Sequence, residues 1–238
     1  MRWHSISKRA GRCTTIALVV AIGFAPAFGQ EHDATVHHRF TDVQKSIAAF
    51  ESPDRAGWQK PDEVIKALGL KPGDSIADIG AGTGYFARRL AKAVGPLGTV
   101  LALDVEPAMV DHMKADAAAS GLGDYRPALV KADDPGLAPH SVDLIFFCDS
   151  LHHVDNRVVY LRNLIPSLKS GGRVVDIDFK EGQLPVGPPP GHKLSQAKVM
   201  GEFEQAGYRL VRKHDFLPYQ YFLEFEPRSG ASEPAQGR

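Results

Sequence analysis

The sequence has little cysteine, no excess of charge of either sign and no metal-binding motif. Its 238 residues include two cysteines, Cys13 and Cys148, and Cys13 lies in a segment that we expect to be removed. A framework of disulfides is therefore excluded. Lysine plus arginine and aspartate plus glutamate both number 28, so the basic excess typical of a nucleic-acid-binding protein is missing. Neither HExxH nor paired CxxC spacing occurs among the ten histidines and two cysteines, and we predict no metal site.

Long apolar runs are also scarce, and the one near the N-terminus is short. It extends from Thr14 to Phe24 and follows four basic residues with no acidic residue among them. A membrane-spanning helix takes about 20 apolar residues, so we expect no stable membrane insertion. Small residues before Gln30 suit cleavage, and we predict a signal peptide over residues 1–29 that directs export to the periplasm or the medium. An uncleaved membrane anchor, an organelle transit peptide and a cytoplasmic chain are the alternatives.

The rest of the chain suits one globular domain, since 43% of all residues are hydrophobic and 24% are charged. We expect residues 30–60 to form a helical lead-in or lid, with a helix from Arg39 to Phe50 and a loop from Glu51 to Trp58. The main domain is expected over residues 61–226. The small and polar residues 227–238 are predicted to be disordered.

From Pro61 onward, apolar segments of strand length alternate with helical ones. Strands are expected at residues 76–79, 99–103, 125–131, 142–148 and 173–179, and helices at residues 61–69, 85–94, 107–120 and 156–168. This alternation predicts a parallel sheet that is covered on both faces. The expected order ends with a loop over residues 182–191, a helix over 194–206, and an antiparallel pair of strands at 208–214 and 219–225.

The most informative stretch is the glycine turn, residues 80–84, which follows a buried strand and precedes a helix. Its three glycines are Gly80, Gly82 and Gly84. Such a turn lets the backbone approach a ligand closely and points a helix N-terminus at it. The dinucleotide pattern GxGxxG/A can be counted from either of two glycines. Counted from Gly80, it fails because Tyr85 stands where a glycine or alanine is required. Counted from Gly82 it fits, but the first glycine of the pattern should follow the strand directly, and here that glycine is Gly80. The better description is Asp-x-Gly-x-Gly-x-Gly from Asp78, and a turn without a ligand is the alternative.

Asp104 ends the next expected strand, twenty residues after Gly84. An acid at this place can accept hydrogen bonds from both hydroxyls of a ribose. The other interpretation is a cap for the helix that begins at Pro107, and the two uses are compatible.

These positions resemble the best-marked motifs of class I S-adenosylmethionine (SAM)-dependent methyltransferases. Asp78 and the three glycines resemble motif I, and the glycines together with Asp104 match the two best-marked positions of the family. Asp133 or Asp134 resembles the acid that meets the adenine amino group, and the choice between them stays open. Residues 148–154 and 168–174 resemble the segments after strand four and before strand five in this family.

The resemblance covers residues 60–226 and is greatest to the small-molecule group of type 11 domains, which includes quinone and arsenite methyltransferase-like proteins. It implies an α/β fold with a Rossmann-like, seven-stranded, mostly parallel sheet, helices on both faces and an antiparallel C-terminal strand. It also implies SAM as the cofactor and a small-molecule acceptor. No cysteine trio is present, so arsenic chemistry based on thiols has no support.

In this topology ligands bind beyond the carboxyl ends of the strands. Four titratable residues are expected on that side: Asp149, His152, Asp178 and His192. We predict His152 as a general base, with packing or capping of the following helix by His152 and His153 as the alternative. Asp149 is expected to bind the amino group of SAM or the acceptor. Tyr85 is expected either to shield the sulfonium or simply to pack, and Trp58, Phe40 and the loop 182–191 to form a lid.

The sequence therefore predicts methyl transfer from SAM to a small molecule. Two alternatives remain, a non-catalytic exported module that binds SAM or a nucleoside, and a Rossmann-type NAD(P) oxidoreductase. The predicted export conflicts with the use of SAM, because SAM is made in the cytosol and would have to be delivered to an exported enzyme.

Overall fold

The computed structural model describes Met1 and residues 43–228 of the chain. The predicted signal peptide, Phe40 and residues 229–238 lie outside the described residues. Within the described part, no helix is long and apolar enough to cross a membrane.

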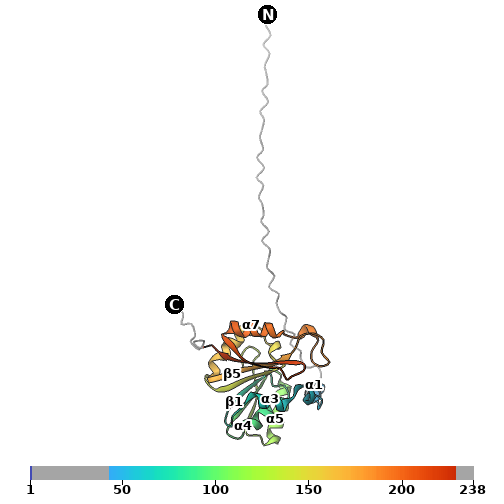
Figure 1. Cartoon of the computed structure of the whole chain (residues 1–238), viewed down its shortest axis with the longest axis vertical. Helices are drawn as coiled ribbons and strands as arrows, with labels where there is room; N and C mark the ends of the chain where they lie inside the picture. Colours follow the sequence, from blue (N-terminus) through green and yellow to red (C-terminus); the bar gives the residue numbers. More distant parts are fainter. Residues whose placement is uncertain (2–42, 229–238) are drawn as a thin grey trace. The chain divides into compact units, whose positions relative to one another are not determined.

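Seven strands form one sheet in the order β3-β2-β1-β4-β5-β7-β6. Figure 1 shows this sheet, with β1 and β5 labelled. Neighbours among the first five strands are parallel, whereas β7 is antiparallel to both β5 and β6. The strands are β1 (Ser75–Ile79), β2 (Thr99–Asp104), β3 (Asp124–Leu129), β4 (Val142–Cys148), β5 (Leu168–Phe179), β6 (Tyr208–His214) and β7 (Gln220–Pro227). The predicted Rossmann-like sheet with an antiparallel C-terminal strand is confirmed.

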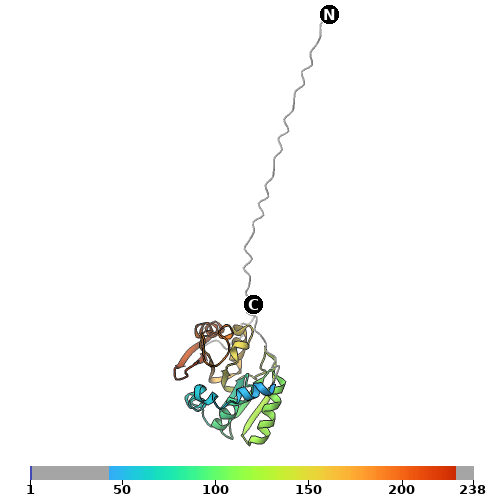
Figure 2. The ribbon, with the colours of Figure 1, turned by 90° about the vertical axis from the view of Figure 1, so that its right-hand side faces the viewer.

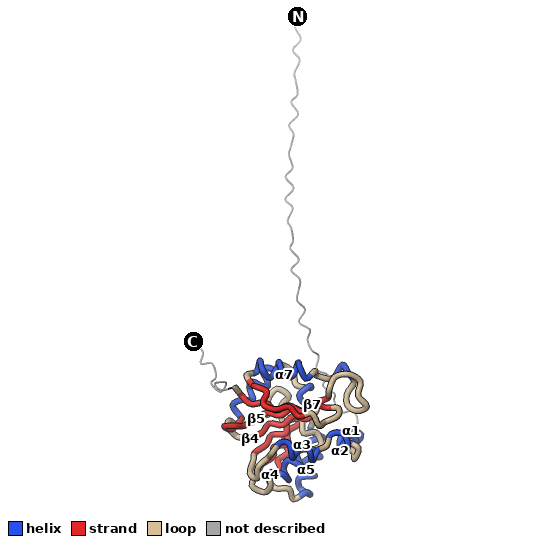
Figure 3. The backbone as a smooth tube through the Cα atoms, in the orientation of Figure 1, coloured by secondary structure: helices blue, strands red, loops and turns tan. Residues whose placement is uncertain are grey.

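Helices cover both faces of this sheet (Figure 3). Successive strand residues point to opposite faces, so β1 places Ile76 in one apolar core and Ala77 in the other. The core around Ile76 is covered by α3 (Pro61–Leu68), α4 (Tyr85–Val94) and α5 (Pro107–Ser120). The core around Ala77 is covered by α6 (Arg157–Leu164) and α7 (Gln196–Ala206).

Two segments differ from the sequence prediction. Residues 51–58 were expected to be a loop, but a short helix, α2 (Arg55–Gln59), forms there after α1 (Val43–Phe50), which lies beside α5 (Figure 2). The predicted helix over residues 156–168 ends at Leu164. Pro166 lies in the 3-10 turn η2 (Ile165–Ser167), and β5 already begins at Leu168. Proline has no backbone N–H to continue a helix, which explains the early end.

Candidate functional site

The glycine turn connects β1 to α4 in a left-handed backbone conformation. Gly80, Gly82 and Gly84 have φ of +75°, +58° and +79°, a region that side chains disfavour. A Cβ at Gly80 would lie 2.4 Å from the Cβ of Ser150, and a Cβ at Gly84 would lie 2.3 Å from the hydroxyl of Tyr125. Only glycine fits at these two positions, so the close packing around the turn depends on them.

Asp104, the last residue of β2, binds the turn through backbone amides. Its Oδ2 accepts from the N–H of Gly82 at 2.7 Å, and its Oδ1 accepts from the N–H of Glu106 at 2.9 Å. Burial raises the pKa of Asp104, and these backbone amides oppose that rise. Each carboxylate oxygen has a further lone pair, so Asp104 can hold the turn and still accept from ribose hydroxyls.

Asp78, on β1, is a buried acid with an unsatisfied oxygen. It is 3% exposed, and its Oδ2 has no hydrogen-bond partner. Burial and then the charge of Asp104 raise the pKa of Asp78 to about 7, while Arg55 and the Ala87 backbone amide oppose this rise. A buried carboxyl group without a partner is costly unless a ligand satisfies it. Asp78 therefore suits a ligand with a cationic donor, such as the ammonium group of SAM.

Tyr85 begins α4 and is buried against two arginines. The guanidinium carbon of Arg55 lies 4.0 Å from the centre of its ring, and that of Arg89 lies 3.9 Å from it. The structure thus shows that the Tyr85 ring packs against other side chains. Shielding of a sulfonium by this ring stays a prediction.

Asp149 follows β4 in a left-handed conformation, with φ of +56°. Its Oδ1 accepts from Nε2 of Gln220 at 2.7 Å, and its Oδ2 accepts from Nε2 of Gln59 at 3.1 Å. Burial and the charge of Asp178 raise its pKa to about 6, and the charge of Arg55 opposes this rise. A non-glycine residue in this conformation is strained and persists only where the surroundings hold it. The two glutamines, which sequence reasoning missed, hold this carboxylate.

His152 lies in the 3-10 turn η1 (Leu151–His153) and pairs with Asp178 of β5. Its Nδ1 is 2.7 Å from Oδ2 of Asp178, with the two side chains 8% and 0% exposed. Burial opposes a charge on His152, but the hydrogen bond to Asp178 and the charges of Asp178 and Asp149 together outweigh it and raise the pKa of the imidazole. Because a carboxylate only accepts, Nδ1 of the neutral ring carries the hydrogen and Nε2 is left as the acceptor. This is the arrangement that a general base requires.

Asp178 itself is fixed, because its Oδ1 accepts from the N–H of Phe179 at 2.7 Å. Asp176 lies two residues earlier on the same face of β5 and is fully buried, and neither of its oxygens has a partner. Burial and the charges of Asp178 and Asp149 raise the pKa of Asp176 well above its usual value. Aspartates at alternate positions of an apolar strand were the sequence signal for this buried acidic cluster.

The lead-in and the loop 182–191 meet at Phe179, the last residue of β5. The ring of Trp58 is centred 5.6 Å from that of Phe179, and a Cβ at Gly187 would lie 2.4 Å from the same ring. Trp58 and the loop 182–191, two of the three predicted lid elements, are therefore neighbours, although a lid function stays a prediction. His192 is exposed in the 3-10 turn η3 (Pro190–His192).

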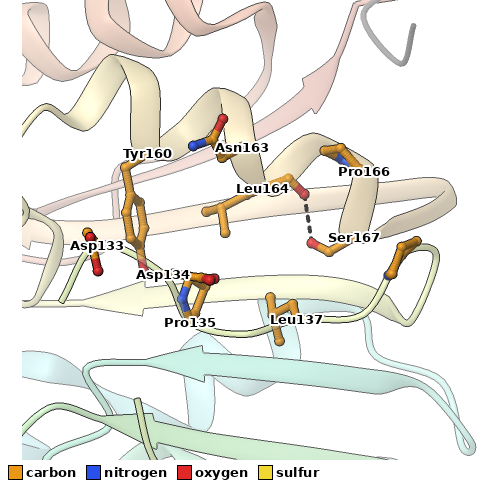
Figure 4. A pocket seen from close by; sticks show the side chains of 10 residues that line it. Asp133, Asp134, Pro135, Leu137, Tyr160, Asn163, Leu164, Pro166 and Ser167 are labelled. Atoms are coloured by element: carbon orange, nitrogen blue, oxygen red, sulfur yellow. Dashed lines mark hydrogen bonds between the residues drawn. The ribbon is translucent and has the colours of Figure 1, made fainter. Parts of the chain in front are cut away.

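Asp133 and Asp134 line a pocket of about 260 Å³ between the β3–β4 connection and α6 (Figure 4). Tyr160 lies in the same pocket, and burial together with these two acids raises the pKa of its hydroxyl. Asp134 is engaged locally, since its Oδ1 accepts from the N–H of Gly136 at 2.8 Å. Which of the two acids meets an adenine stays open. In the described part of the chain, no group of three or more His, Cys, Asp or Glu side chains is placed to hold a metal ion.

The residues at the ends of β1 and β2 thus fit SAM on three counts. The glycine turn allows close approach, Asp104 has lone pairs for ribose, and Asp78 has an orphaned oxygen for an ammonium group.

Comparison with known proteins finds similarity to methyltransferases. A family model described as a methyltransferase domain matches residues 76–172. The chain is 25% identical to the ubiquinone/menaquinone biosynthesis C-methyltransferase UbiE of Ectopseudomonas mendocina, over 84% of this chain and 83% of that protein. It is 30% identical to a demethylmenaquinone methyltransferase of Staphylococcus aureus over 63% of each chain, which is less than two thirds of that relative. A solved SAM-dependent methyltransferase from Aquifex aeolicus superposes with a TM-score of 0.73 and 29% identity, covering 77% of this chain and 97% of that one.

Proposed function

Because this chain belongs to the class I SAM-dependent methyltransferases, we propose that it methylates a ring carbon of a hydroquinone, an aromatic small molecule that carries two hydroxyl groups. SAM, when bound, supplies an electrophilic methyl group. The residues of the chain have to orient the acceptor, exclude water and remove a proton.

The observation that carries the proposal is the hydrogen bond between His152 and Asp178. It leaves Nε2 of His152 able to accept the proton of an acceptor hydroxyl, and the charge of Asp178 stabilises the resulting imidazolium. Loss of that proton makes the ring carbon next to the hydroxyl a stronger nucleophile. After methyl transfer, this carbon releases its own hydrogen as a proton and the ring regains its aromatic character.

The charges of the site support a neutral acceptor. Asp149, Asp176 and Asp178 gather at the ends of β4 and β5, and their mutual repulsion contributes to the raised pKa values of the first two. An acceptor with its own carboxylate would add to this repulsion. The names of two relatives point to quinone-type acceptors as well.

The test is methyl transfer from isotope-labelled SAM to a panel of hydroquinones, the corresponding oxidised quinones, amines and thiols. We expect a methylated product from a hydroquinone that lacks a ring methyl, with the new carbon–carbon bond identified by NMR. The oxidised quinone should remain unmodified, because it has no hydroxyl proton to remove. Methylation of only amines or thiols, or of a hydroxyl oxygen alone, would contradict the proposal.

We also propose that residues 1–29 direct export. Fusion of this segment to a reporter that is active only outside the cytoplasm should give activity, and deletion of the segment should abolish it. A reporter that stays inactive with the segment in place would refute export.

A further inference from the structure

Arg55 is a fixed cation at the edge of the cofactor site that the predicted motifs do not include. Its Nη1 donates to the backbone oxygen of Phe50 at 2.8 Å, and its Nε donates to Oε1 of Gln59. Its guanidinium group lies 4.0 Å from the ring centre of Tyr85. Three contacts therefore hold the side chain, so little conformational entropy remains to be lost when it binds a ligand.

The charge of Arg55 is not paired with a carboxylate in the described part of the chain, and its Nη2 has no protein acceptor there. Arg88 differs in this respect, because its Nη2 is 2.7 Å from both carboxylate oxygens of Glu51. The charge of Arg55 acts on the site itself, because it opposes the upward pKa shifts of Asp78 and Asp149. Its contacts place Arg55 near the carboxyl ends of both β1 and β4. It packs on Tyr85 after the glycine turn, and its partner Gln59 donates to Asp149 after β4.

The amino-acid half of SAM presents an ammonium and a carboxylate on one carbon. Asp78 suits the ammonium, but its charge and that of Asp149 would repel the carboxylate unless a cation lies beside them. A guanidinium group with a free terminal nitrogen is a strong hydrogen-bond donor to a carboxylate.

We propose that Arg55 binds the carboxylate of the amino-acid half of SAM through Nη2, and that Tyr85 and Gln59 position it for this contact. The lead-in then takes a direct part in cofactor binding: α2 supplies the cation, and Phe50 lies over the glycine turn, 3.7 Å from the position of a Cβ on Gly82. This inference rests on SAM binding and is independent of the identity of the acceptor.

The test compares two ligands by calorimetry in the absence of any acceptor. S-adenosylhomocysteine has the amino-acid half, whereas methylthioadenosine keeps the nucleoside and the sulfur but lacks that half. For Arg55→Met we expect the Kd of S-adenosylhomocysteine to rise about 10-fold or more, as for the loss of a charged hydrogen bond. The Kd of methylthioadenosine should change less than about twofold, since this ligand has no carboxylate for Arg55 to bind. Arg55→Lys keeps the charge but not the planar fork. Its Kd for S-adenosylhomocysteine should lie between that of the unaltered chain and that of Arg55→Met.

Arg89→Met is the matched control, because Arg89 lies at a similar distance from the ring of Tyr85 and donates to the backbone oxygen of that residue. It should leave both affinities unchanged. An analogue of S-adenosylhomocysteine without the carboxylate but with the amine should bind Arg55→Met and the unaltered chain equally. If Arg55→Met weakened the binding of S-adenosylhomocysteine and of methylthioadenosine equally, Arg55 would act only through the packing of α2. That result would overturn the proposal. Unchanged binding of S-adenosylhomocysteine, or none by the unaltered chain, would overturn it too.

Discussion

The two halves of the site are built from different kinds of interaction. At the ends of β1 and β2, Asp104 is held by backbone amides of residues 82 and 106, so this half depends on main-chain geometry. At the ends of β4 and β5, side chains hold side chains: Gln59 and Gln220 bind Asp149, and Asp178 binds His152. The first half therefore depends on the course of the backbone, and the second depends on which side chains are present.

The halves also differ in how they offset buried charge. Backbone N–H groups oppose the raised pKa of Asp104. The acidic cluster at β4 and β5 lacks that support, and two oxygens of Asp176 stay without partners. The β4–β5 half also holds the pair of His152 and Asp178, an arrangement poised for proton transfer. We infer that this half does the chemistry, while the β1–β2 half, where one oxygen of Asp78 is likewise without a partner, binds SAM.

If the β4–β5 half does the chemistry, the largest effect is expected on turnover after substitution of His152 or Asp178. His152→Gln and Asp178→Asn should each lower kcat by a factor of about 10² to 10⁴, the usual contribution of a general base. The Kd of S-adenosylhomocysteine should stay within about twofold, because neither residue belongs to the β1–β2 half. Steady-state kinetics and calorimetry give the two values.

His153→Gln is the control for this pair. His153 is exposed, and its ring centre lies 4.1 Å from that of His152. Turnover close to that of the unaltered chain is expected for it. If His152→Gln lost cofactor affinity as much as turnover, the proposed division between the halves would fail.

A smaller effect, on stability, compares two glycines of the β1–β2 half. Gly80→Ala adds a methyl group that would lie 2.4 Å from the Cβ of Ser150, whereas at Gly82 the nearest atom is 3.7 Å away. Both positions have positive φ, which costs about 1 kcal/mol for a side chain. We expect the free energy of unfolding to fall by about 3 kcal/mol for Gly80→Ala and about 1 kcal/mol for Gly82→Ala, measured in urea. If both variants lowered the free energy of unfolding equally, backbone strain alone would explain the requirement for glycine in this turn.

The β1–β2 half was predictable because its residues are close in the chain and its pattern is contiguous. The hydrogen bond from Gly82 to Asp104 joins residues 22 apart; Gly82 lies just after β1, and Asp104 is the last residue of β2. Position at the carboxyl end of parallel strands was enough to bring these two together. The alternation of apolar strands and helices also predicted the parallel direction of the first five strands, which the structure confirms.

The β4–β5 half was predictable only in part. Asp149 and His152 follow directly from the end of β4, but the partners of Asp149 are 90 and 71 residues away. Gln220 reaches it only through the register of β7 on β5, which no local pattern specifies. Arg55 and Gln59 lie in α2, whose five residues include Gly57 and have weak helix propensity on their own. Contacts with the rest of the domain stabilise this helix, and those contacts are not visible in its sequence.

A further test of the binding half is Asp104→Asn. The amide Nδ2 would place a donor against the N–H of Gly82 or of Glu106, so one of these hydrogen bonds is lost. We expect the Kd of S-adenosylhomocysteine to rise about 10- to 100-fold, as for a lost charged hydrogen bond. Glu106→Gln is the control, since residue 106 contributes only its backbone N–H. An unchanged Kd for Asp104→Asn would leave Asp104 with no more than a capping role.

The smallest effect concerns protons and the affinity of the binding half. The pKa of Asp78 is about 7 in the free chain because burial raises it, and a ligand ammonium beside it should lower this pKa. Binding then releases a proton near pH 6, where the free carboxyl is mostly protonated, and none near pH 8. By linkage, affinity for S-adenosylhomocysteine should rise about tenfold from pH 6 to pH 8.

Calorimetry near pH 6 in buffers of different ionisation enthalpy measures the released proton, and Asp78→Asn should abolish both the release and the pH dependence. The stability of the chain without a ligand should change with pH in the opposite direction to the affinity. The folded state keeps the proton on Asp78 at a pH where the unfolded chain has lost it, so stability should fall as pH rises from about 4 to about 7. Asp149, with a pKa of about 6, adds to this fall, so Asp78→Asn should reduce the slope without removing it. Proton uptake on binding, in place of release, would mean that the ligand brings a negative charge to Asp78, and the ammonium would have to bind in the β4–β5 half.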